Sequence, residues 1–172
     1  ARAIYVNKRS GRLRQGGSTL TQQLAKNLFL DSDQTLKRKA QEAYIAVYLE
    51  QRFSKREIIE LYLGRVYFGS GAYGIDAAAE RYFAKPAADM TLGESAILTG
   101  LLKAPSEYAP THTTESAARR ATTVIQSMVR DEVISSEQRD AVYAEKIWVD
   151  PPNSSGSEHY FMDFAAIEMT RV

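Results

Sequence analysis

The run Gly16-Gly-Ser-Thr-Leu-Thr-Gln-Gln-Leu-Ala-Lys-Asn27 limits the local fold more than any other part of this sequence. Two glycines allow the backbone to approach a ligand closely, and Ser18 is suited to cap the helix that follows. A helix N-terminus also favours bound anions. The run therefore predicts a helix over about 18–30 with an anion site at its start. Its core-facing stripe is expected to be Leu20, Leu24 and Leu28.

The polar face of this helix carries hydroxyl, amide and ammonium groups in place of the mixed Glu and Lys of an ordinary solvated face. Side chains three and four apart share one face of a helix. Such groups suit sugar hydroxyls and phosphate oxygens, although a plain capped surface helix is the alternative. The candidate substrate-binding residues are Ser18, Thr19, Thr21, Gln22, Gln23, Lys26 and Asn27.

The rest of the chain is almost entirely helical in pattern. Apolar periodicity and capping residues predict helices over about 34–52, 54–63, 76–83, 91–103, 114–130 and 136–146. Capping boxes of the Ser/Thr-x-x-Glu/Gln kind open three of them, at Ser54, Thr91 and Ser135. The glycine-rich and aromatic stretch 64–74 is expected to be an ordered loop. The predicted fold class is mainly α.

Composition limits the possible functions of the chain. Its 172 residues are enough for one domain with a real core, and the absence of cysteine excludes disulfides and thiolate metal sites. No apolar run is long enough to span a membrane. Residues 1–30 contain basic side chains and no acidic one, which suits a pyrophosphate or an anionic lipid headgroup. Because aromatic side chains for base stacking are scarce there, we expect no nucleic-acid partner.

The C-terminal part of the sequence is typical of a linker between two regions of a protein. The stretch Asp150-Pro-Pro-Asn-Ser-Ser-Gly-Ser157 has the composition of a linker. After it, Tyr160, Phe161, Phe164 and Ile167 recur at helical spacing. We therefore predict a domain over 1–147, a linker over 148–158, and the start of a following region over 159–172.

Glu42 is the main candidate for chemistry. It lies in the segment Glu42-Ala-Tyr-Ile-Ala-Val-Tyr-Leu49, whose apolar character predicts a helix buried on most sides. A carboxylate there is costly unless it is paired or faces a cleft. Arg38 and Lys39, four and three residues earlier, are placed to pair with it. A structural Glu–Arg clamp is the alternative to an active-site role.

Four ordered segments resemble the peptidoglycan glycosyltransferases, the lipid II polymerases of glycosyltransferase family 51 found in class A penicillin-binding proteins. The resemblance spans about residues 1–144. The first segment is the run 16–30, and the others are Arg38-Lys-Ala-Gln-Glu42, Lys55-Arg-Glu-Ile-Ile-Glu-Leu-Tyr-Leu-Gly-Arg-Val-Tyr-Phe-Gly69 and Leu101-Leu-Lys-Ala-Pro-Ser106. It implies a lysozyme-like fold and a transpeptidase domain after the predicted linker.

The resemblance also implies the reaction. Lipid II would be polymerised into β-1,4 glycan strands with inversion and release of undecaprenyl pyrophosphate. Glu42 matches the family's second catalytic glutamate, Arg38 and Lys39 match its basic neighbours, and Lys103 is a further substrate-binding candidate. A divalent cation such as Mg²⁺, with Glu42 as a ligand, is the candidate cofactor. Implied partners are lipid II, the growing strand, the membrane surface and moenomycin-type phosphoglycolipid inhibitors, at the periplasmic face of the bacterial inner membrane.

The chain departs from the family pattern in three places. The first motif, which carries the general-base glutamate, would lie upstream of residue 1, so we predict a domain truncated at its N-terminal side and inactive alone. Gln34 stands where an arginine is common, and Gly64 stands where an asparagine is expected. Two alternatives stay open: a substrate-binding fragment that lacks turnover, and a lysozyme-like hydrolase with Glu42 as its acid.

Overall fold

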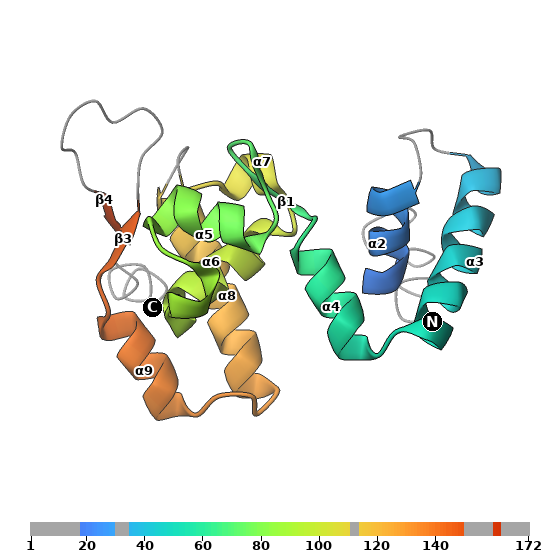
Figure 1. Cartoon of the computed structure of the whole chain (residues 1–172). Helices are drawn as coiled ribbons and strands as arrows, with labels where there is room; N and C mark the ends of the chain where they lie inside the picture. The colour runs from blue at the N-terminus through green and yellow to red at the C-terminus, as the bar shows by residue number, and fades with distance from the viewer. Residues whose placement is uncertain (1–17, 30–34, 111–113, 150–159, 163–172) are drawn as a thin grey trace, which may run out of the picture. The chain divides into compact units, whose positions relative to one another are not determined.

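The computed structural model describes residues 18–29, 35–110, 114–149 and 160–162. The chain divides into two compact units, residues 1–63 and residues 64–172 (Figure 1). Predicted elements that fall in 1–17, 30–34, 111–113, 150–159 and 163–172, among them the basic N-terminal segment and Gln34, lie outside the described residues. Within the described residues, no helix is both long enough and apolar enough to cross a bilayer.

The described residues of the first unit form the helices α2 (Leu20–Phe29), α3 (Leu36–Arg52) and α4 (Lys55–Leu63), close to the predicted ranges. Helix α2 packs on both α3 and α4. The core between them is built from small and aliphatic side chains, which allow three short helices to approach closely. Its buried members include Leu24, Ala25, Ala46, Leu49 and Ile58.

The start of α2 differs from the sequence prediction. Thr19, and not Ser18, caps the helix: its Oγ1 accepts from the Gln22 amide at 3.2 Å. The Gln22 Oε1 accepts in return from the Thr19 amide, also at 3.2 Å, which completes a capping box. The helix therefore begins one residue later than predicted. Leu20, expected in the core-facing stripe, is 39% exposed.

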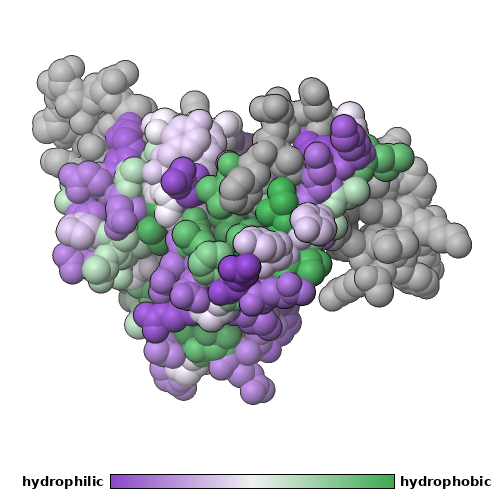
Figure 2. Space-filling view, turned by 45° about the vertical axis from the view of Figure 1, so that its right-hand side comes forward, coloured by the Kyte–Doolittle hydropathy of each residue, from purple (hydrophilic) through white to green (hydrophobic). Residues whose placement is uncertain are grey.

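Helix α3 is not buried on most sides, so that prediction is wrong. Its buried residues are Glu42, Ala46 and Leu49, which form a single stripe. Large apolar side chains on the other side are open to solvent, namely Leu36, Tyr44, Val47 and Tyr48. Figure 2 shows hydrophobic residues at the surface among hydrophilic ones. The apolar sequence of α3 thus reflects an exposed apolar face in addition to a buried one.

The second unit is also mainly helical. Its buried helix α6 (Leu92–Leu101) packs along α8 (Thr114–Arg130), which is amphipathic and turns its small residues inward. Around this pair lie α5 (Ile75–Phe83), the 3₁₀ turn η1 (Ala87–Asp89), α7 (Pro105–Tyr108) and α9 (Ser136–Ala144) (Figure 1). The expected capping boxes are present at Ser54, Thr91 and Ser135. Mainly α is therefore the confirmed fold class.

The expected loop 64–74 is a small hairpin instead. Strands β1 (Tyr67–Gly69) and β2 (Ala72–Tyr73) pair antiparallel. Gly69 has φ +94°, and a Cβ there would lie 2.7 Å from the Pro105 carbonyl oxygen, so this position requires glycine. The buried Tyr82 hydroxyl donates to the Phe68 carbonyl at 3.0 Å and fastens the hairpin to α5.

Strands β3 (Ile147–Val149) and β4 (Tyr160–Met162) form a second antiparallel pair. The segment 160–162 is therefore a strand where helical spacing was expected, because pairing with β3 supplies its backbone hydrogen bonds. The pair joins chain segments on either side of most of the predicted linker. The domain boundaries at 147 and 158 stay predictions.

Candidate functional site

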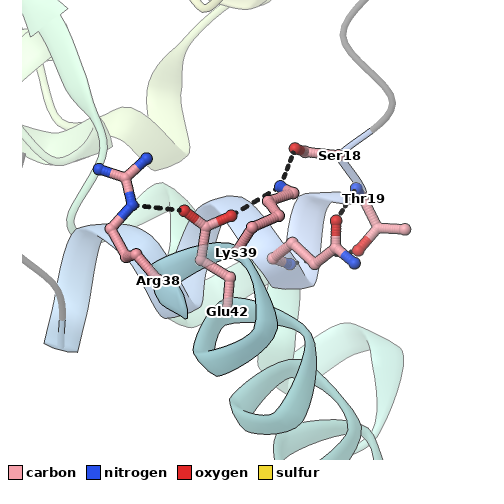
Figure 3. A network of polar contacts seen from close by, with 6 residues as sticks. Ser18, Thr19, Arg38, Lys39 and Glu42 are labelled. Atoms are coloured by element: carbon pink, nitrogen blue, oxygen red, sulfur yellow. Dashed lines mark hydrogen bonds and ion pairs between the residues drawn. The ribbon is translucent and has the colours of Figure 1, made fainter. Parts of the chain in front are cut away.

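Glu42 lies at the centre of a polar network in the first unit. Its Oε1 lies 3.2 Å from the Arg38 Nε, and its Oε2 accepts from the Lys39 Nζ at 2.6 Å. All three side chains project from the first turns of α3, where spacings of three and four residues bring them together (Figure 3). The Glu42 side chain is only 4% exposed, against 48% for Lys39. The predicted pairing is therefore present.

The electrostatic state of Glu42 follows from these contacts. The hydrogen bond from Lys39 is the largest influence and lowers the pKa of Glu42 below its ordinary value. Burial acts in the opposite direction, while the charges of Lys39, Arg38 and Lys26 lower the pKa further. Glu42 is thus an ionised carboxylate at neutral pH, and its oxygens are directed at cations.

Lys39 connects this carboxylate to the start of α2. Its ammonium donates to the Ser18 Oγ at 2.6 Å as well as to Glu42 (Figure 3). Ser18, Gln22, Gln23, Lys26 and Glu42 together line a cavity of about 290 Å³. The cavity therefore combines a helix N-terminus, Lys26 and amide side chains, and Lys39 is bonded to two of its lining residues. This combination suits an anion that also carries hydroxyl groups.

The two glutamines of this cavity are less available than the sequence suggested. Gln22 uses its Oε1 in the capping box with Thr19. Gln23 accepts through its Oε1 from the Tyr62 hydroxyl at 3.2 Å. In both cases the side-chain oxygen is used within the unit, so the amide nitrogens are the groups better suited to meet sugar or phosphate oxygens.

The other predicted site residues lie elsewhere. Thr21 is buried and donates to the Glu50 Oε1 at 2.7 Å, and Thr19 and Thr21 line a different cavity from that of Glu42. Asn27 is exposed on α2 and is not among the residues that line either cavity. Lys103 is exposed in the turn after α6 of the second unit. Its predicted role in binding substrate stays a prediction.

The donor set does not fit a resident metal ion. In the described ranges, no group of three or more His, Asp or Glu side chains is placed to hold one. The carboxylate oxygens of Glu42 already face Arg38 and Lys39, which would compete with a cation. In the part of the chain that is described, Glu42 therefore belongs to no set of three such side chains that would hold a Mg²⁺ ion.

Two residues that bond to predicted site residues escaped sequence reasoning. Tyr62 is 3% exposed, and burial raises the pKa of its hydroxyl, which stays protonated and donates to Gln23. Its position within the Tyr-Leu-Gly segment of α4 was the only available signal. Glu50 accepts a hydrogen bond from the Thr21 hydroxyl. The two residues are 29 positions apart in the sequence, and no local pattern predicts a contact at that separation.

Comparison with known proteins supports the resemblance. A family model described as Transglycosylase matches residues 1–129. Penicillin-binding protein 1A of Aquifex aeolicus is 45% identical over 162 residues, which are 94% of this chain and 22% of that protein. Penicillin-binding protein 2D of Bacillus subtilis is 42% identical over 160 residues, 91% of this chain and 23% of that protein.

A solved structure agrees with the sequence matches. The crystal structure of Penicillin-Binding Protein 1A from Haemophilus influenzae has a TM-score of 0.53 and 28% identity with this chain. The match covers 78% of this chain and 17% of that one. The chain thus spans about a fifth of the length of the relatives it matches.

Proposed function

The chain belongs to the transglycosylase family, and on that premise we propose that it acts in polymerising lipid II into β-1,4 glycan strands, with inversion and release of undecaprenyl pyrophosphate. The observation that carries this proposal is the ion-pair network of Glu42, Arg38 and Lys39 beside the N-terminus of α2. The penicillin-binding protein relatives support the choice of substrate.

Glu42 acts in this proposal as a positioning residue. A carboxylate whose pKa is lowered by three nearby cations is a weak proton acceptor, so it is poorly suited to be the general base. It is well suited to hold the Arg38 guanidinium and the Lys39 ammonium at fixed places. Lys39, whose side chain is 48% exposed, can meet an incoming phosphate while it stays paired with Glu42.

The reaction needs positive charge where the leaving group departs. Breaking the anomeric C–O bond leaves the bonding electrons on the pyrophosphate oxygen, and the added negative charge must be met by donors already in place. Such donors are provided by Lys26, which lines the 290 Å³ cavity, and by the amides at the start of α2. Lys39, bonded to the lining residues Ser18 and Glu42, adds a further donor. A divalent cation, if used, would take most of its ligands from the pyrophosphate itself.

The general base is expected from outside the described residues. Attack by the acceptor's C4 hydroxyl requires a group that takes its proton as the new bond forms. Within the described part of the first unit, Glu42 is the only carboxylate that lines the polar cavity, and it is held by cations. The upstream glutamate implied by the family pattern fits this requirement. Without it, the chain would bind the precursor and not turn it over.

Contact with a membrane surface is part of the proposal, since a lipid-linked precursor is held in a bilayer. The exposed stripe of α3, formed by Leu36, Tyr44, Val47 and Tyr48, supports it. Arg52 lies over the Tyr48 ring at 5.1 Å, so the stripe ends at a cation. Apolar and tyrosine side chains beside basic ones are typical of helices at a lipid interface. We propose that the protein lies at the periplasmic face of the bacterial inner membrane. We also propose that moenomycin-type phosphoglycolipids inhibit it by binding in the 290 Å³ cavity beside Glu42.

The test is a gel assay with labelled lipid II, run on this chain and on a form extended upstream to include the first motif. We expect polymer from the extended form, none from its Glu42→Gln variant, and undiminished polymer from Glu60→Gln, whose side chain is 61% exposed on α4. Polymer from the extended Glu42→Gln variant would refute the role of Glu42. Binding of lipid II without polymer from the extended form would favour a binding fragment, and release of reducing ends from preformed glycan would favour a hydrolase.

A further inference from the structure

The first unit contains a second, larger cavity that the proposed reaction does not use. It has a volume of about 480 Å³ and lies among α2, α4 and the end of α3. Its walls are the apolar side chains of Leu20, Phe53, Ile58 and Ile59. Ile58 is 4% exposed and forms the floor, while Leu20, Phe53 and Ile59 are 39%, 39% and 46% exposed. Large apolar side chains that stay open around one hollow indicate a binding site.

Two opposite charges stand at the same cavity. Glu50 lines it, and the Thr21 hydroxyl fixes its Oε1 at 2.7 Å, so the carboxylate is held in place at the wall. Lys55, at the start of α4, lines it as well. The cavity therefore offers one held anion, one cation and an aliphatic floor.

These features restrict the occupant. A purely apolar chain would desolvate Glu50 and Lys55 without pairing them, which is costly. A phosphate group would meet the carboxylate of Glu50. A ligand with an amine, a carboxylate and small aliphatic groups satisfies all three parts of the cavity. A short peptide that contains a diamino acid and alanines has this chemistry.

We propose that this cavity binds the stem peptide of the lipid-linked precursor, with Glu50 on its free amine and Lys55 on a carboxylate. The inference rests on the proposed function, because that precursor carries its peptide on the sugar joined to the pyrophosphate. The two cavities share the first turn of α2: Thr19 lines the peptide cavity, while Ser18 and Gln22 line the polar one. Thr19 and Gln22 are bonded to each other, so the cavities are neighbours.

A direct test uses this chain and the free pentapeptide L-Ala-γ-D-Glu-L-Lys-D-Ala-D-Ala, followed by methyl NMR. We expect the methyl signals of Ile58 and Ile59 to shift on titration, while those of Leu61, exposed on the same helix, do not. Farnesyl phosphate serves as the competing probe for a lipid occupant. Shifts at Ile58 and Ile59 with farnesyl phosphate and none with the peptide would overturn the proposal.

A second test separates this inference from the proposed function. The affinity of the chain is measured for a short-chain disaccharide pyrophosphate with and without its pentapeptide. Glu50→Gln and Lys55→Met should each weaken binding of the peptide-bearing ligand about five- to tenfold and leave the peptide-free one unchanged. Glu60→Gln and Arg56→Met, paired to each other on the exposed side of α4, are the matched controls. If Glu50→Gln and Lys55→Met weaken binding of both ligands equally, or of neither, the peptide site is refuted. The proposed function would still stand in that case if Glu42→Gln weakens binding of both ligands.

Discussion

The Lys39 ammonium lies 2.6 Å from the Glu42 carboxylate and 2.6 Å from the Ser18 hydroxyl, so one side chain joins the start of α3 to the start of α2. This contact brings two motifs that are separated in sequence to one cavity. It also fixes the direction of the Glu42 charge, which faces cations and not bulk water.

Removal of the Lys39 charge should weaken anion binding. In Lys39→Met, the cavity loses a charge-assisted donor, and we expect the affinity for geranyl pyrophosphate to fall about tenfold. Isothermal titration calorimetry at low salt would measure it. Lys37→Met, two residues away and lining a different hollow of α3, is the control and should bind as the parent does. Equal losses in both variants would indicate a nonspecific charge effect.

Thr19 and Ser18, at the start of α2, should contribute unequally to the free energy of unfolding. Thr19→Ala removes the hydroxyl that caps the helix and should cost about 1 kcal/mol of unfolding free energy. Ser18→Ala should cost clearly less, because its hydroxyl bonds an exposed lysine. Urea unfolding followed by circular dichroism would compare them. A larger loss of unfolding free energy in Ser18→Ala than in Thr19→Ala would show that Ser18 caps the helix, as the sequence predicted.

The ion pairs of Glu42 should make the free energy of unfolding depend on pH in the acidic range. Because its folded-state pKa is lowered, its contribution is fully present above the unfolded value of about 4.3. It is then lost as the pH falls through the folded value. We therefore expect the stability difference between the parent and Glu42→Gln to shrink from pH 6 toward pH 2 in urea titrations. A difference that stays constant over this range would mean that Glu42 is not held by cations in the folded protein.

The exposed stripe of α3 should bind lipid. Sedimentation with phosphatidylglycerol vesicles should carry down the parent chain, and Tyr44→Ser and Val47→Ser should each reduce the bound fraction severalfold. The solvent-exposed Val133 of the second unit offers the matched control, and Val133→Ser should bind as the parent does. Unchanged binding of all three variants would show that another surface meets the membrane.

Local sequence patterns predicted many of the helices and their caps, because these features depend on residues that are close together in the chain. Helices over most of the predicted ranges, and capping boxes at Ser54, Thr91 and Ser135, follow from spacings of three and four residues. The pairing of Glu42 with Arg38 and Lys39 follows from the same spacing. The family resemblance then added what spacing alone could not, namely the reaction class.

Only the tertiary structure decided which side chains meet across helices. The bonds from Lys39 to Ser18, from Tyr62 to Gln23 and from Thr21 to Glu50 span 21, 39 and 29 residues, and no local period encodes such distances. Packing also decided that an apolar helix, α3, would keep one apolar face exposed. Sequence thus determined the helices and their charges, because these follow from local geometry. The fold determined where the charges converge, since burial and partner choice depend on residues remote in the chain.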